Sequence, residues 1–198
     1  MKTLLTELRT SLLLTLVFAV LLCGAYPVAV WAAAQVLFPA QANGSLVRDA
    51  AGTVRGSRLL AQGFVSDKYF QPRPSAAGTG YDAANSSGTN LGPTSRKLAD
   101  SIGDAVAAYR KANGLGTDAP VPADAVTSSG SGLDPHISPA NARIQAARVA
   151  RARHLPIGTV LAAVDDATEA RSWGVFGEAG VNVLRANLAL DRRAPEAR

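Results

Sequence analysis

The sequence predicts an α/β (α+β) protein in which one N-terminal transmembrane helix precedes a single mixed α/β domain with long ordered loops. Two observations lead to this prediction. No charged side chain lies between Arg9 and Arg48, and Leu12 to Phe38 consists mostly of Leu, Val and Ala. Beyond this run, apolar residues recur at helical spacing between stretches rich in Gly and Pro, as in a domain of helices joined by loops. A chain of 198 residues allows about one domain beside the span.

The apolar run is long enough to cross a bilayer. Leu12 to Trp31 supplies the roughly 20 apolar residues that a spanning helix needs. Lys2 and Arg9 precede the run and no basic residue follows until Arg48, which favours a cytoplasmic N-terminus. We therefore expect a protein of the cell inner (plasma) membrane with residues 1–10 cytoplasmic, 11–38 transmembrane and 39–198 extracytoplasmic.

A cleavable secretory signal is the alternative. Ala32-Ala33-Ala34 before Gln35 fits the small-x-small cleavage pattern. Signal cores are roughly 7 to 15 residues long, shorter than this run, so a retained span is preferred. Cleavage after Ala34 would instead release a secreted periplasmic binding or interaction protein.

Composition excludes several classes of site. Cys23 is the only cysteine, which rules out an internal disulfide and a zinc site built from cysteines. The net charge of +5 comes without aromatic residues interleaved in a basic stripe, so nucleic acid is not an expected partner. The arginines at 143, 148, 151 and 153 could face lipid headgroups or an acidic partner, or form a solvated helix face.

The elements of the second part follow from local signals. Residues 45–60 are typical of a hairpin with its turn at 49–52, and residues 71–93 are too rich in Gly, Pro and Ser for regular structure. The remaining predictions are a helix from the Thr94 cap to Asn113, a linker at 115–123, a short strand at 125–128, a helix from Ser138-Pro139 to about His154, a helix at 159–167 and an extended segment at 173–176. Residues 181–190 fit either a strand or a helix.

No convincing catalytic set is present. Ser131, Asp134 and His136 are the residue types of a hydrolytic triad, but they lie within six consecutive positions, which rarely lets three side chains converge on one bond. Ser129 to Gly132 could cradle an anion ahead of the next helix or simply form a turn. We predict no catalytic residue and no metal ligand, with a hydrolase using Ser131 and His136 as a rival.

Several rare stretches resemble one family, the C subunit of the bacterial potassium-transporting Kdp ATPase. The stretches are Tyr69-Phe70-Gln71-Pro72-Arg73-Pro74-Ser75-Ala76, Asn90-Leu91-Gly92-Pro93-Thr94, the run from Ser129 to Pro139, Gln145 with Arg148-Val149-Ala150, Val181-Asn182-Val183-Leu184, and Asn187 to Asp191. They occur in the same order over nearly the whole chain.

The resemblance implies a non-catalytic accessory subunit of a high-affinity, ATP-driven potassium uptake complex. Its partners would be an ATP-hydrolysing P-type subunit, a channel-like potassium-translocating subunit and membrane lipid. The family is described as a catalytic chaperone that raises the ATP affinity of the hydrolysing subunit, and Gln145 matches the position proposed to contact ATP; no cofactor is expected to bind firmly. We expect subunit contacts in two long loops, residues 71–93 and 128–138. The expected contact residues are Arg73, Pro74, Ser75, Asn90, Leu91, Gly92, Ser131, Gly132, Asp134 and His136.

Overall fold

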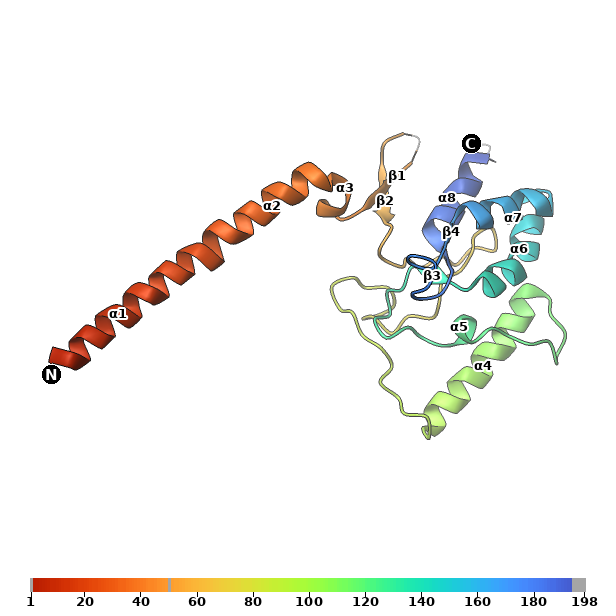
Figure 1. Ribbon diagram of the computed structural model, residues 1–198. Helices are drawn as coiled ribbons and strands as arrows, with labels where there is room; N and C mark the ends of the chain where they lie inside the picture. Colours follow the sequence, from red (N-terminus) through yellow and green to blue (C-terminus); the bar gives the residue numbers. More distant parts are fainter. Residues whose placement is uncertain (1, 50, 194–198) are drawn as a thin grey trace. The chain divides into compact units, whose positions relative to one another are not determined.

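A computed structural model describes residues 2–49 and 51–193, and the chain divides into two compact units. The first unit ends at Leu46 and the second begins at Val47. Figure 1 labels most of the helices and strands of both units. The α/β composition predicted from the sequence is confirmed, with one long apolar helix at the N-terminus.

The first unit is one long helix followed by a short turn of helix. Helix α1 (Lys2–Phe18) continues through a π-helical segment, η1 (Ala19–Ala25), into α2 (Tyr26–Leu37), and α3 (Pro39–Ala42) follows. The helix Thr3–Leu37 contains an apolar window whose mean hydropathy is 2.4, and no residue of that window is buried. At 1.5 Å per residue this helix is longer than the ~30 Å hydrocarbon core, so it is long and apolar enough to cross a membrane.

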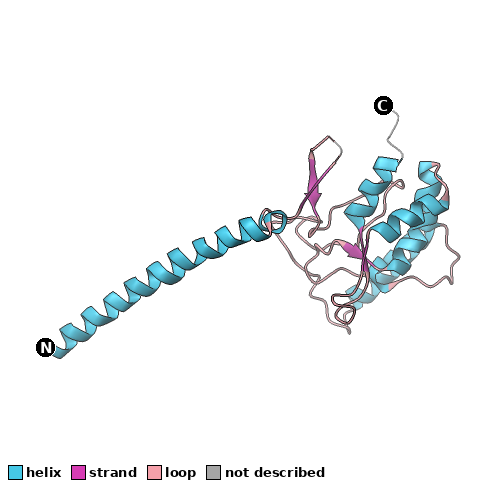
Figure 2. Cartoon of the chain, turned by 45° about the horizontal axis from the view of Figure 1, so that its top comes forward, coloured by secondary structure: helices cyan, strands magenta, loops and turns pink. Residues whose placement is uncertain are grey.

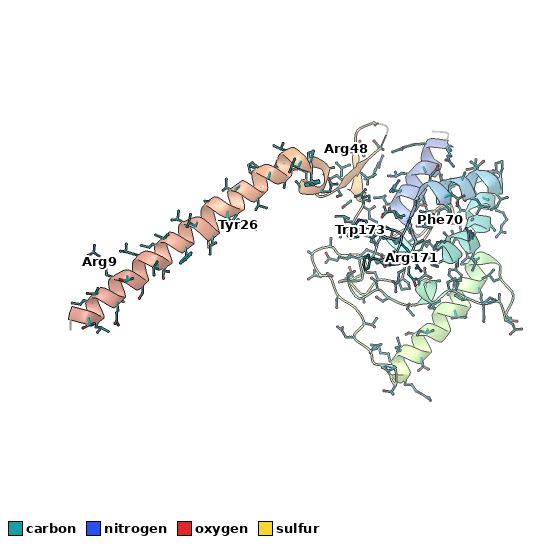
Figure 3. The ribbon with its side chains drawn as sticks, in the orientation of Figure 1. Arg9, Tyr26, Arg48, Phe70, Arg171 and Trp173 are labelled. Carbon is teal, nitrogen blue, oxygen red and sulfur yellow. The ribbon has the colours of Figure 1, made fainter. Side chains whose placement is uncertain are left out.

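The π-helical segment lies directly before Pro27. Proline lacks an N–H and its ring clashes with the carbonyl four residues earlier, which normally breaks or kinks a helix. Here the Tyr26 N–H bonds the Leu21 carbonyl, five residues back, so the ladder widens before the proline. The helix therefore continues past Pro27, and the side chains of Arg9 and Tyr26 project outward from it (Figure 3).

The predicted hairpin is confirmed with a shorter second strand. It pairs β1 (Leu46–Arg48) with β2 (Val54–Ser57), so Leu59 and Leu60 lie beyond the ladder. Asp49 Oδ1 accepts the backbone N–H groups of Ala51 and Thr53, each at 2.9 Å, and this bonding fixes the turn.

The predicted helices of the second unit are confirmed within two residues at each end. They are α4 (Arg96–Asn113), α6 (Pro139–Arg153) and α7 (Ile157–Asp166). Ser138 caps α6 by accepting the Asn141 N–H at 3.1 Å. The cap of α4 is Ser95, at 3.3 Å from the Leu98 nitrogen, in place of the predicted Thr94.

A small sheet was not predicted. Its order is β3-β5-β4, all antiparallel, with β3 (His136–Ile137), β4 (Thr168–Glu169) and the central β5 (Gly180–Asn182). In Figure 2 the strands of this unit are short and lie among its helices and loops. The chain turns from β5 directly into α8 (Val183–Arg193), because Asn182 caps the helix by accepting the Arg185 N–H at 3.1 Å. Residues 181–190, whose spacing fits either a strand or a helix, therefore begin as a strand and continue as a helix.

Two predictions were wrong. Residues 125–128 do not form a strand, since Ala123–Val126 is a short helix, α5, whose Asp124 carboxylate bonds the start of α6. Residues 173–176 are not extended. Ser172 and Phe176 pair with each other and Trp173 to Val175 form the turn between them. In both segments the conformation depends on hydrogen bonds between residues, which the alternation of polar and apolar residues cannot predict.

The core lies under α6, α7 and α8. Helix α6 packs on α7, α7 on α8, and α4 on α5 and α6. Phe70, from the loop before residue 71, is fully buried among the apolar side chains of these helices and the central strand (Figure 3). This buried ring ties the start of the long loop to the helical layer.

Candidate docking surface

The two loops predicted to make subunit contacts pack against each other. Ser75 Oγ donates to the Gly132 carbonyl at 2.6 Å, and the Ser87 N–H donates to the Ser131 carbonyl at 3.0 Å. Ser75 Oγ also accepts the Tyr81 N–H at 2.9 Å, which folds the first loop back on itself. Residues 71–93 and 128–138 therefore form one ordered surface.

Gly132 lies where the backbones of the two loops approach each other closely. Its φ is +68°, a left-handed conformation that favours glycine. A Cβ built there would lie 2.6 Å from the Ser87 carbonyl oxygen and 2.7 Å from the Ala77 nitrogen. Both contacts are with backbone, so the joined surface requires glycine at this position.

A line of alternating charges runs from the first loop across the small sheet. Arg73 Nη1 lies 3.1 Å from Asp134 Oδ2, and the His136 ring lies between the carboxylates of Asp134, at 3.6 Å, and Glu169, at 3.2 Å. Glu169 is paired in turn with Arg185 at 3.2 Å. Two carboxylates and two guanidinium groups thus flank one half-buried imidazole.

The central strand makes room for this histidine. His136 pairs with Asn182 across the ladder, and Glu169 pairs with Gly180 on the other edge. A Cβ at Gly180 would lie 3.0 Å from the His136 Cβ and 3.3 Å from its Cγ. The absence of a side chain there lets the imidazole reach across β5 to Glu169.

The two carboxylates set the electrostatics of His136. Interaction with Asp134 raises the pKa of the imidazole; burial opposes this, and the charge of Glu169 adds to it, so the net shift is upward. Burial alone would raise the pKa of the Asp134 carboxyl, but bonds to His136 and Arg73 outweigh it and lower that pKa. The protonated histidine and ionised aspartate are therefore favoured together.

A groove of about 430 Å³ opens beside this charged line. Its lining includes Arg73, Asp134 and His136 together with the segment Phe176 to Gly180. The described lining includes the carboxylates of Asp124, Asp134, Glu169 and Glu178. A larger cleft of about 790 Å³, next to β2 and α8, is lined by none of the predicted site residues.

Gln145 lies away from the groove, in a buried polar network. Its side chain is 2% exposed. Oε1 accepts the Gln71 N–H and Arg148 Nη2, each at 2.8 Å, while Nε2 donates to the Gln71 carbonyl at 3.0 Å and to Asn141 Oδ1 at 2.9 Å. All of the hydrogen-bonding positions of the amide are thus occupied within the chain.

Arg148 extends this network toward α4 and the loop before Phe70. Its guanidinium bonds Asn113 Oδ1 at 3.1 Å and the backbone carbonyls of Asp67 and Tyr69, at 2.7 and 3.1 Å. Burial lowers the pKa of the guanidinium, partly offset by the charge of Asp67. Arg148 is therefore a buried structural group and not part of a lipid-facing basic helix surface, although Arg143 and Arg151 of α6 are exposed.

The other predicted contact residues lie in the same long loop but not in the groove. Asn90 is exposed with a φ of +53°, Leu91 is half-buried and Gly92 is exposed. Pro74 is half-buried between Arg73 and Ser75. The structure therefore groups Arg73, Asp134 and His136 at the groove, joins Ser75, Ser131 and Gly132 at the contact between the loops, and leaves residues 90–92 further along.

The geometry does not assemble the hydrolytic triad. Ser131 Oγ accepts the Leu133 N–H at 3.1 Å, as in a local turn, while His136 is directed to Asp134 and Glu169. Within residues 2–49 and 51–193, no group of three His, Cys, Asp or Glu side chains is placed to hold a metal ion. The rival prediction of a Ser131–His136 hydrolase finds no nucleophile–base contact here.

Sequence reasoning missed three contributors to the surface. Glu169 and Arg185 lie far from His136 in the sequence, and no local pattern links them. Trp173 is 92% exposed on the turn beside the groove. A tryptophan in a short segment flanked by glycine is a signal that could have identified it as a surface contact residue.

Comparisons with known proteins agree over nearly the whole chain. A family model described as KdpC, the c chain of K⁺-transporting ATPases, matches residues 8–192. The chain is 56% identical over 194 residues to a potassium-transporting ATPase KdpC subunit of Myxococcus xanthus, covering 97% of this chain and 89% of that one. It is 54% identical to KdpC subunits of Rhodospirillum rubrum and Mycobacterium tuberculosis H37Rv, covering 96% and 94% of this chain and 98% of each relative. The chain therefore belongs to the KdpC family, the c chain of K⁺-transporting ATPases.

Proposed function

We propose that this chain is the non-catalytic accessory subunit that assembles and stabilises a high-affinity, ATP-driven potassium uptake complex. Its apolar helix packs against membrane helices of the partners, and its second unit lies on the extracytoplasmic side, over the outer mouth of the channel-like potassium-translocating subunit. ATP hydrolysis belongs to a separate P-type subunit.

The observation that supports this role is the joined surface of residues 71–93 and 128–138. The loops are held by hydrogen bonds, by the buried ring of Phe70 and by Gly132, and they present a charged groove. Long loops ordered in this way on a rigid scaffold are typical of recognition surfaces.

The extracytoplasmic placement of the second unit rests on the expected topology. Lys2 and Arg9 before the span favour a cytoplasmic N-terminus, so residues 39–198 would be extracytoplasmic at the inner membrane. The rival is release as a secreted protein by cleavage after Ala34. The intact mass of the chain purified from membranes separates the two, because cleavage would remove the first 34 residues.

Gln145 acts in this proposal as a positioning residue and not as a direct nucleotide ligand. Its amide is buried and fully bonded within the chain, and the proposed topology puts it across about 30 Å of hydrocarbon from cytoplasmic ATP. An effect of this chain on the ATP affinity of the hydrolysing subunit, as in a catalytic chaperone, is then exerted through assembly.

Copurification tests the proposal. The full-length chain, tagged and isolated from membranes, should bring with it a P-type ATPase subunit and a potassium-translocating subunit. Removing residues 40–198 while keeping the span should abolish assembly or high-affinity potassium uptake. Unchanged transport by the truncated form, or a full-length chain that copurifies with neither subunit, would refute the proposal.

A further inference from the structure

The turn beside the groove presents aromatic side chains to solvent. Trp173, Val175 and Phe176 are 92%, 72% and 64% exposed, and the two rings meet edge to face with centroids 6.3 Å apart. The label of Trp173 in Figure 3 marks this turn in the second unit. We call residues 172–176 the aromatic tip.

The aromatic tip is braced by its own backbone. The Ser172 N–H bonds the Phe176 carbonyl at 2.9 Å, and the Phe176 N–H bonds the Ser172 carbonyl at 3.0 Å. Within this closed turn Trp173 has a φ of +54°, a conformation that is unfavourable for a bulky residue. An exposed indole on strained backbone adds little to the stability of the chain, so its role points outside the molecule.

The aromatic tip continues into the acidic groove. Phe176 belongs to both, and Glu178, two residues further on, is an exposed carboxylate of the lining. The described lining carries four carboxylates, of Asp124, Asp134, Glu169 and Glu178, against the guanidinium of Arg73 and the imidazole of His136, in a chain whose net charge is +5. The groove is therefore an acidic site on a basic protein, and it disfavours phosphates and nucleotides.

We propose that the aromatic tip and the acidic groove together dock an extracytoplasmic segment of a partner subunit that carries a Lys or Arg side chain next to an apolar socket. The cation enters the groove toward Glu178, and the rings of Trp173 and Phe176 enter the socket. This inference rests on the proposed function, because it names the chemistry of the partner at the same surface. Aromatic anchors beside complementary charge are the usual centres of protein interfaces.

Substitutions in the full-length, tagged chain test the surface. Trp173→Ser and Glu178→Lys should each lower the amount of copurified partner subunits at least tenfold. Val65→Ser and Asp104→Lys are the matched controls, since Val65 is 94% exposed and Asp104 is an exposed carboxylate of α4, and neither lines the groove. All four side chains are exposed, so all four variants should keep the thermal midpoint of the parent chain. Effects of Trp173→Ser and Glu178→Lys within twofold of the controls would overturn the inference.

A photo-crosslinking benzophenone amino acid at position 173 identifies the occupant. A crosslink to a peptide of a partner subunit that has a Lys or Arg within a few residues supports the proposal. A crosslink to lipid or to a second copy of this chain, or none at all, overturns it. If the parent chain still copurifies with the pump in those cases, only this inference fails; a parent chain that brings down no partner subunit refutes the proposed function itself.

Discussion

The side-chain amide of Gln145 closes a two-bond ring with the backbone of Gln71, accepting its N–H at 2.8 Å and donating to its carbonyl at 3.0 Å. Asn187 of α8 does the same for the preceding residue, at 2.8 Å from the Phe70 nitrogen and 3.0 Å from its oxygen. Side chains of α6 and α8 thus bond the backbone N–H and carbonyl groups of two adjacent residues, as the backbone of a neighbouring strand would in a sheet. The long loop that follows is anchored at its first residue.

This pairing separates a positioning role from direct contact with ATP. Gln145→Ala leaves the half-buried backbone groups of Gln71 unpaired and should lower the free energy of unfolding by about 3 kcal/mol. Asn187→Ala should cost a similar amount at Phe70. If Gln145 only positions the loop, Gln145→Ala and Asn187→Ala should weaken the ATP affinity of the assembled pump to a similar extent. The affinity is measured at a temperature below the thermal midpoint of each variant. An effect confined to Gln145→Ala would indicate direct contact.

The junction of the two loops should be intolerant of a methyl group at position 132. Gly132→Ala combines a left-handed residue with backbone clashes and should destabilise the chain by roughly 2 to 5 kcal/mol in denaturant unfolding. Gly130→Ala is the control, because a Cβ at Gly130 has nothing within 4 Å; it should change the stability by less than about 0.5 kcal/mol. Equal effects of the two substitutions would contradict the packing described here.

Stability should depend on pH through His136. The folded chain holds its pKa above the unfolded value of about 6.5. The contribution of His136 is therefore fully present below that value and is lost as the pH rises through the higher folded pKa. His136→Gln should flatten the decline in unfolding free energy as the pH rises above about 6.5, and Asp134→Asn should reduce that decline. A decline of the same slope in His136→Gln would assign it to other groups.

Asn182 should contribute through two separate bonds. Its Oδ1 caps α8, and its Nδ2 donates to the Arg58 carbonyl at 2.9 Å. Asn182→Ala removes both and should cost about 2 to 3 kcal/mol. Asn182→Asp keeps the accepting oxygen of the cap and should be the milder of the two in thermal unfolding. A more damaging Asn182→Asp would show that burial of the added charge outweighs the cap.

Local signals carried most of the helical prediction. Ser138-Pro139 marks the start of α6 and Asn113-Gly114 the end of α4, because a cap or a stop is a property of a few consecutive residues. The sheet escaped prediction since β3 and β4 are each two residues long, too short to show alternation. Short α5 escaped for a different reason: the bonds of Asp124 to Ser138 and Asn141 connect residues 14 and 17 positions apart.

The site shows the same division. Composition predicted that residues 71–93 lack regular structure, as the structure shows. That this loop and residues 128–138 contact another subunit stays a prediction. The alternating charges could not be predicted, because the contact between His136 and Glu169 depends on a ladder and on the missing side chain of Gly180. The polar residues of α6 did carry a signal: Asn141, Gln145 and Arg148 recur at spacings of four and three, which places them on one face of a helix.

The π-helical segment before Pro27 has a consequence for how the apolar helix meets its neighbours. A wider turn holds more residues than an α-turn, and each additional residue turns every later side chain by about 100° around the axis. Side chains that share one face of α1 are therefore not on the same face as the side chains that continue their spacing along α2. In the proposed spanning orientation, a partner helix that follows the first half would cross to another stripe of side chains at Cys23 to Pro27, and each leaflet would meet a different face of the helix.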